Sequence, residues 1–150
     1  MTIGNGVTSI GEGAFRDCSG LVSVTIPDGV TSIGLFAFNG CTSLKSVSIP
    51  SSVKSIGSEA FWNCNNLESV HITDLSAWCK RDDTSAFFYT SAFYDIPHLY
   101  LNGKEVTDLV IPNDVTSISN DAFYGCSGLT SITIGNSVTS IGAGAFCDCI

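Results

Sequence analysis

The side chains best suited to chemistry lie between residues 71 and 108, where two histidines, a tyrosine and an aspartate occur: His71, His98, Tyr100 and Asp108. Imidazole and carboxylate groups can ligate a metal or act as a general base. Such sites normally show close ligand spacing, but the sequence contains no HxxxH, HExxH, GxSxG or CxxC motif. A metal-binding or hydrolytic site around His71, His98 and Asp108 is therefore the least favoured alternative. We expect a non-enzymatic protein without a cofactor.

Seven cysteines are the second group of candidates for chemistry, and most of them follow a fixed interval. An interval of 23 residues separates Cys18, Cys41 and Cys64, and also separates Cys126 from Cys149. Stacked coils would place equivalent Cα atoms about 4.8 Å apart with parallel Cβ vectors, which disfavours the roughly 3.8 Å Cβ separation of a disulfide. We therefore expect these thiols to be buried and reduced. Cys79 and Cys147 lie outside the interval and are predicted to be the reactive thiols; a pairing of Cys79 with His71 or His98 as its base is a weaker alternative.

The same interval recurs among the apolar residues, which identifies a repeat. The isoleucines that close the units are 23 residues apart on both sides of an interruption: Ile3, Ile26, Ile49 and Ile72, then Ile111 and Ile134. The second unit, TIPDGVTSIGLFAFNGCTSLKSV, has its constant positions at Ile26, Val30, Ile33, Ala37, Phe38, Cys41, Leu44 and Val47. One coil cannot bury so thin an apolar stripe, whereas stacked coils bury it against each other. Phe38, Phe61 and Phe123 should therefore be nearly fully buried over equivalent positions of neighbouring coils.

Each unit is expected to contain two strands and a turn. The LxxVxI pattern, as in 44–49, alternates like a half-buried strand, and the segment 30–33 forms a second short strand. Ala37, Phe38 and Cys41 favour one helical or 3₁₀ turn that folds inward. Equivalent strands should pair in parallel. Two columns would then face away from the core: Ser23, Ser46, Ser69, His98, Asp108 and Ser131 in the first, and Thr25, Ser48, His71, Tyr100, Val110 and Thr133 in the second.

Residues 72 to 110 depart from the interval, because Ile72 and Ile111 are 39 residues apart. Asn102-Gly103 is typical of a tight hairpin turn with positive φ, so we expect a long coil from 72 to 101 followed by a hairpin. Either arm of that hairpin could join the parallel sheet. Seven of the fifteen aromatic residues lie in this unit: Trp78, Phe87, Phe88, Tyr89, Phe93, Tyr94 and Tyr100. They fill a wider coil or form an exposed patch, with Trp78 expected in the core and Tyr100 on the outward face.

The unit IPxxVxxIgxxAFxxCxxLxxV recurs through nearly the whole chain and resembles the BspA-like (Treponema-type) leucine-rich repeats of bacterial surface proteins. The resemblance implies an arc-shaped leucine-rich-repeat solenoid with a concave parallel β-sheet, used for adhesion and recognition at the cell surface or after secretion. The segments DLSAWC and HLYLNGKEVTDLVIP also look like an irregular unit of such proteins. Because the chain opens inside a strand and stops within a coil, we interpret it as a single truncated solenoid. Its regular coils are 3–71 and 111–150, and its irregular long coil plus hairpin is 72–110.

Composition narrows the choice of partner and function. Six basic against 14 acidic residues give a net charge of −8, which excludes a nucleic-acid binder because phosphates need a basic surface. No apolar run approaches the roughly 20 residues of a membrane helix, and uncapped terminal coils favour self-association. The favoured function is an adhesin-like module that binds a protein or glycan, with a structural spacer as the alternative. Candidate ligand-binding residues are His71, His98, Tyr100, Asp108, Lys80, Arg81, Ser46 and Ser69.

Overall fold

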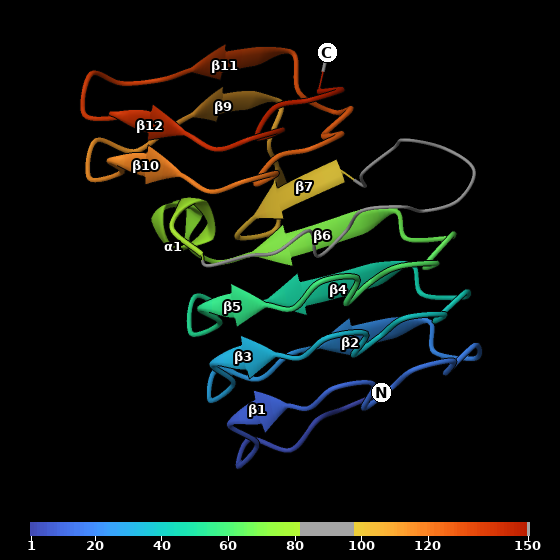
Figure 1. Ribbon diagram of the computed structural model, residues 1–150. Helices are drawn as coiled ribbons and strands as arrows, with labels where there is room; N and C mark the ends of the chain where they lie inside the picture. The colour runs from blue at the N-terminus through green and yellow to red at the C-terminus, as the bar shows by residue number, and fades with distance from the viewer. Residues whose placement is uncertain (82–97, 150) are drawn as a thin grey trace.

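The protein is a solenoid in which the chain winds through stacked coils whose paired residues are 23 positions apart (Figure 1). The computed structural model describes residues 1–81 and 98–149. Each regular coil contributes one strand to a long-strand ladder and one strand to a short-strand ladder, on different sides of the coil. The parallel pairing confirms the repeat architecture that the sequence predicts.

The long-strand ladder carries both predicted columns of outward residues. Its members are β2 (Ser23–Thr25), β4 (Ser46–Ile49), β6 (Ser69–Ile72) and β7 (His98–Leu101), and separately β9 (Asp108–Val110) with β11 (Ser131–Thr133). The register pairs Ser46 with Ser69 and Ser69 with His98, as predicted. Val47 and Ile49 are buried, while the serines between them are only half-buried. The two-residue alternation of the strand therefore separates the core from an outward face.

The short-strand ladder repeats one Ser-Ile pair in each regular coil. Its members are β1 (Ser9–Ile10), β3 (Ser32–Ile33) and β5 (Ser55–Ile56), and separately β10 (Ser117–Ile118) with β12 (Ser140–Ile141). The isoleucine of each pair points inward and is buried, except Ile141 in the last described coil. Branched side chains suit such strands because they pack well on a pleated, half-buried surface.

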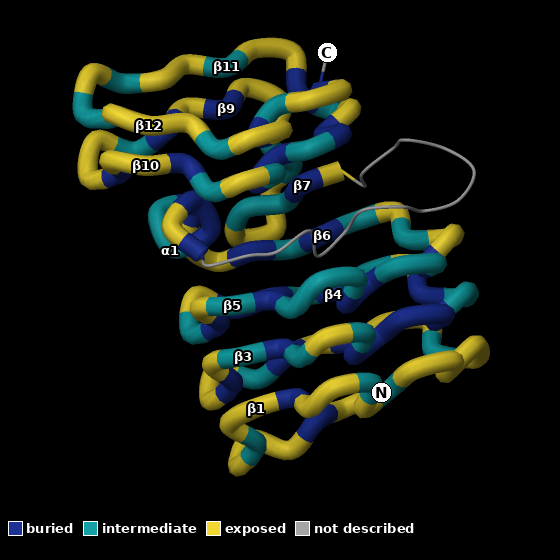
Figure 2. Tube along the Cα trace, viewed as in Figure 1, coloured by how far each residue is buried: buried dark blue, intermediate teal, exposed yellow. Residues whose placement is uncertain are grey.

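A turn follows the short strand of each regular coil and places a phenylalanine in the core. The ring centroids of Phe15 and Phe38 lie 5.1 Å apart, those of Phe38 and Phe61 5.2 Å, and those of Phe123 and Phe146 5.4 Å. Phe38, Phe61 and Phe123 are fully buried, which confirms the predicted register. Figure 2 shows buried residues recurring at equivalent places in successive coils.

Two left-handed backbone positions shape this turn. In the second coil they are Phe36, with φ 55°, and Gly40, with φ 74°. The i to i+3 hydrogen bonds of a 3₁₀-like turn are present, from the N–H of Ala37 to the carbonyl of Gly34 (3.3 Å) and from the N–H of Cys41 to the carbonyl of Phe38 (3.2 Å). Because left-handed residues cannot continue a right-handed helix, each turn stays short.

The helix α1 (Leu75–Cys79) takes the place of a short strand in the irregular unit and lies between β5 and β10 (Figure 1). The Asp74 carboxylate caps it by accepting a hydrogen bond of 3.0 Å from the N–H of Ala77. Trp78 is buried, and its Nε1 donates to the carbonyl of Ala122 over 2.8 Å, which confirms its predicted place in the core. The other aromatic residues of the unit, Phe87, Phe88, Tyr89, Phe93 and Tyr94, lie outside the described residues.

The predicted hairpin joins β7 to β8 (Lys104–Glu105) through Asn102 and Gly103, whose φ angles are 50° and 81°. Positive φ at both central residues matches the twist of the flanking strands. The first arm, β7, joins the parallel sheet beside β6, and β8 returns antiparallel on the far side of β7. The five-stranded sheet therefore ends at β8, and β9 starts a separate sheet with β11.

The short-strand ladder is also divided in the irregular unit, where α1 separates β5 from β10. Hydrogen bonds specific to this unit join α1 to the following coil. The N–H of Ser119 donates to the carbonyl of Cys79 over 2.9 Å, and the Ser119 hydroxyl donates to the same carbonyl over 2.8 Å. This junction therefore differs in chemistry from the repetitive contacts between regular coils.

Candidate functional site

The outward face of the five-stranded sheet carries two stacked rings. His71 on β6 and Tyr100 on β7 are register partners, and their ring centroids lie 4.7 Å apart with an angle of 21° between the ring planes. Neighbouring strands are about 4.8 Å apart, so the rings stand side by side as the strands do. Both side chains are half-buried. The structure therefore brings together two residues that the sequence places in one column.

The floor around the two rings is lined with small hydroxyl groups. Ser48 of β4 is the register partner of His71 on the side opposite Tyr100, and both it and Ser46 are half-buried. The Ser69 hydroxyl lies 3.1 Å from Nε2 of His71, where either atom can donate according to the tautomer of the ring. Ser46 and Ser69 thus lie beside the histidine on the same outward face.

His98 forms an ion-pair contact that sequence reasoning missed. Its Nδ1 contacts the Glu105 carboxylate across the hairpin, and the exposed fractions of the two side chains are 54% and 35%. Glu105 is the antiparallel register partner of Tyr100, so its side chain shares the outward face. The Asn102-Gly103 turn was the available signal, because a two-residue hairpin fixes which residues face each other. Gly128 packs close to both groups, since a Cβ there would lie 2.9 Å from the His98 Nδ1 and 3.1 Å from the Glu105 carboxylate.

Asp108 lies beyond the hairpin, on β9, and makes its own set of contacts. Its Oδ1 accepts hydrogen bonds from the hydroxyls of Ser131, over 2.7 Å, and Thr130, over 3.4 Å. The register pairs Asp108 with Ser131 and Val110 with Thr133, as the predicted columns require. Val110 is 60% exposed. Asp108 thus belongs to the separate sheet of β9 and β11.

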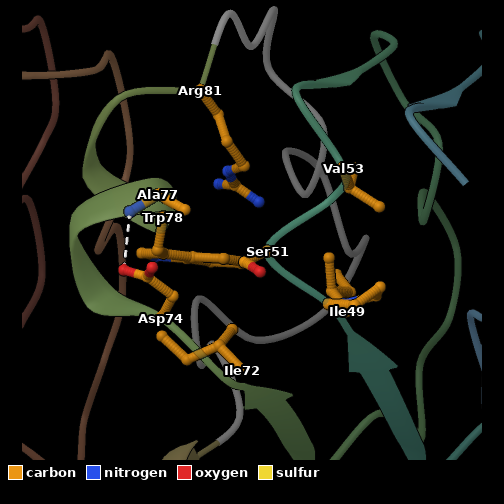
Figure 3. Close-up of a pocket in the computed structure, with 9 residues that line it drawn as sticks. Ile49, Ser51, Val53, Ile72, Asp74, Ala77, Trp78 and Arg81 are labelled. Atoms are coloured by element: carbon orange, nitrogen blue, oxygen red, sulfur yellow. Dashed lines mark hydrogen bonds between the residues drawn. The ribbon is translucent and has the colours of Figure 1, made fainter. Parts of the chain in front are cut away.

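Lys80 and Arg81 lie at the end of α1, in the short-strand column (Figure 3). The Lys80 Nζ is 2.8 Å from Oδ2 of Asp114, and hydrogen bonds from Lys80 and then from the Ser76 hydroxyl hold the pKa of the Asp114 carboxyl below its usual value. The guanidinium carbon of Arg81 lies 3.4 Å from the centroid of the Trp78 ring, and Arg81 is buried. The structure therefore does not bring these two cations together with His71 and Tyr100.

A small recess beside Trp78 and Arg81 offers little space for a ligand. It lies between α1 and the chain around Ile49, Ser51 and Val53, and it has room for about one water molecule (Figure 3). Within residues 1–81 and 98–149, no three His, Cys, Asp or Glu side chains gather as a metal site would require. No helix among the described residues is long and apolar enough to cross a membrane.

The thiols follow the predicted ladder with one exception and one error. Cys41, Cys64, Cys126 and Cys149 are buried as predicted, and the Sγ of Cys64 donates to the carbonyl of Phe38, one coil earlier, over 3.2 Å. Cys18 was expected to be buried with them but is exposed, because it lies in the first coil, where no other coil packs over it. The prediction that Cys79 is reactive, alone or with a histidine base, is wrong: the side chain is fully buried, and burial raises its pKa to about 12. Cys147 is exposed, as predicted.

Stacked 23-residue coils with parallel ladders define a leucine-rich-repeat solenoid. The chain belongs to the BspA-type leucine rich repeat family, whose model matches six copies over residues 1–96 and 95–150. The family that the sequence resembles is thereby confirmed.

Two solved structures are similar to the chain along nearly its whole length. A leucine rich repeat protein from Treponema pallidum has a TM-score of 0.61 and 23% identity, over 99% of this chain and 75% of that one. A leucine rich cell surface protein from Faecalibacterium prausnitzii has a TM-score of 0.56 and 32% identity, over 99% of this chain and 44% of that one. The chain thus spans three quarters of the first structure and less than half of the second. No curated protein matches the chain.

Proposed function

We propose that the chain is a non-enzymatic, adhesin-like binding module of a cell-surface or secreted protein. The observation that supports this most is the stack of His71 and Tyr100 on the outward face of β6 and β7. Inward-facing residues build the core, so these two half-exposed rings are available to a partner. Aromatic side chains often anchor interfaces because they bury a large area and keep a polar end.

The proposed binding face consists of the rings and the polar residues that share their sheet face: Ser46, Ser69, His71, His98 and Tyr100, with Asp108 beyond the hairpin. Lys80 and Arg81 stand apart from it at α1. Membership in the BspA-type family supports a recognition role. The similarity to a cell surface protein from Faecalibacterium prausnitzii supports a surface location.

A structural spacer is the second candidate function, and one observation favours it. The regular coils present the same small hydroxyl at equivalent positions, as in the register of Ser23, Ser46 and Ser69. Repetitive hydroxyls hydrogen-bond with many groups and discriminate little among partners. A spacer would tolerate substitution anywhere on this face.

Two matched serine substitutions test the binding face. Ser46 on β4 and Ser55 on β5 belong to the same coil and are both half-buried, but they lie on the long-strand and short-strand ladders respectively. We expect binding to an immobilised basement-membrane extract to fall about tenfold with Ser46→Arg and to stay unchanged with Ser55→Arg, measured by surface plasmon resonance. Equal binding by wild type and Ser46→Arg, or no retention of the wild type, would refute the proposed function and favour the spacer.

A further inference from the structure

We infer that the outward face beside His71 and Tyr100 binds a neutral carbohydrate. This inference rests on the proposed function and names the ligand class of that same face. Three observations carry it: the ring geometry, the pairing of the nearby charges, and the hydroxyl lining. Each is independent of the others, and together they fit the chemistry of a pyranose, which has one apolar ring face and a rim of hydroxyl groups.

The rings form a step in the surface of the sheet. One face of the His71 ring is covered by Tyr100, and the register places Ser48 on the other side, with Thr25 one strand further along. A serine side chain is much shorter than an imidazole, so the ring rises as a wall above a floor of small hydroxyls. The C–H groups of a sugar ring carry slight positive charge, and the face of an aromatic ring is slightly negative, which favours stacking between them.

The charges of this face are largely paired within the protein. Lys45 Nζ lies 3.2 Å from Oε1 of Glu68, on the residues that directly precede β4 and β6. Nδ1 of His98 contacts the Glu105 carboxylate beside the rings. A charged partner gains little from such a face, because its counter-charge is already engaged. The chain's net charge of −8 further disfavours an acidic polymer.

The groups around the rings match the hydrogen-bonding needs of sugar hydroxyls better than those of a protein surface. Serine hydroxyls both donate and accept, and a carboxylate such as Glu105 accepts from a sugar hydroxyl. Protein hot spots instead lie in pockets that surrounding contacts keep dry. Ser46, Ser48 and Ser69 flank His71 with polar groups, and the exposed Val110 lies on a separate sheet. The lining therefore favours a glycan over a protein segment.

The test titrates the protein with three neutral oligosaccharides, cellohexaose, maltohexaose and mannohexaose, and follows the ring signals of His71 and Tyr100 by NMR. We expect at least one of them to shift both sets of signals, and oligogalacturonate, an acidic counterpart, to bind at least about tenfold more weakly. The inference is wrong if none of the neutral sugars moves these signals, or if the acidic oligomer binds as tightly.

Variants separate a role of the rings from a change in folding. Tyr100→Ala is expected to weaken sugar binding about tenfold, while Tyr100→Phe stays within about threefold, because the ring is the contact. Ser48→Val keeps both rings but fills the floor beside His71, so it should also lose binding, and it serves if the alanine variant fails to fold. Ser55→Val on β5 is the matched control, with no expected effect. Sugar binding that survives Ser48→Val would overturn the inference.

The failure of this inference can be told apart from the failure of the proposed function. Mild periodate oxidation destroys the vicinal diols of glycans in the basement-membrane extract, whereas protease digestion destroys its proteins. We expect periodate to abolish the retention that depends on Ser46, and protease to spare it on released glycans. Retention that depends on Ser46 but survives periodate would refute the carbohydrate and leave the binding face intact as a protein-binding surface.

Discussion

Replacing Phe38 by alanine is the most direct test of how the coils hold together. The ring of Phe38 is fully buried and stacked between Phe15 and Phe61, with centroid distances of 5.1 and 5.2 Å. The substitution removes an entire ring from the core and breaks both stacks. Because each coil of a solenoid contacts only its neighbours, this one side chain contributes to two of the interfaces that stabilise the fold.

The expected loss follows from the geometry of the site. Truncating a buried phenylalanine to alanine costs about 3–5 kcal/mol, and each aromatic pair adds about 0.5–1.5 kcal/mol beyond burial. With two stacks lost, we expect a destabilisation near about 5 kcal/mol. Phe15 is the matched control: it is only partly buried and stacks on Phe38 alone among the described rings. Phe15→Ala should cost about 2 kcal/mol.

Urea unfolding followed by far-UV circular dichroism measures both variants against the wild type. The free energy of unfolding comes from the midpoint and slope of each transition, and an unchanged slope shows that the same amount of surface unfolds. A loss below about 1 kcal/mol for Phe38→Ala would show that the ring does not occupy the core as described. Equal losses for Phe38→Ala and Phe15→Ala would contradict the claim that stacking on both faces matters.

Three further outcomes are expected. In the native protein, iodoacetamide should label the exposed Cys147 but not Cys79, whose pKa burial raises to about 12; mass spectrometry that finds native labelling of Cys79 would contradict its burial. Trp78→Ala should destabilise by about 3–5 kcal/mol in thermal unfolding, because it empties a buried site and leaves the carbonyl of Ala122 without its donor; a loss under about 1 kcal/mol would count against this. Lys80→Met should lower stability slightly at pH 7, and the loss should vanish as pH falls well below 3.8, the ordinary pKa of Asp114. The folded-state pKa of that carboxyl is lowered, so its contribution is present above the unfolded pKa and lost on protonation. A loss that persists in acid would contradict the ion pair.

The regular part of the fold could be predicted from the sequence because its physics is repetitive. One interval places every equivalent residue in register, so the columns through Ser46, Ser69 and His98, and through His71 and Tyr100, follow from counting. The hairpin at Asn102 was equally accessible, since Asn-Gly tolerates the positive φ that a tight turn demands. Local chemistry decided these features, and the structure confirms them.

The irregular unit could not be predicted to the same depth, because its contacts are long-range and occur once. Nothing near Glu105 in the sequence indicates that it pairs with His98; the choice of β7 as the sheet arm sets that pair. The helix α1 has only five residues, and no periodicity reveals so short a helix. Its formation buries Cys79 and carries Arg81 onto Trp78, and for this reason a cysteine predicted to be reactive is inert.

The singular junction at α1 has a consequence for how the chain finds its native pairing. Regular coils are nearly interchangeable, so a nascent chain could align one coil too early or too late at little local cost. The bonds from Ser119 to Cys79 and from Trp78 to Ala122 exist in one alignment only. A slipped chain would bury an indole N–H without its acceptor, which is costly. The irregular unit thus acts as an index mark against frame-shifted assembly, and gene duplication can change the number of regular coils while a second such mark would make the alignment ambiguous.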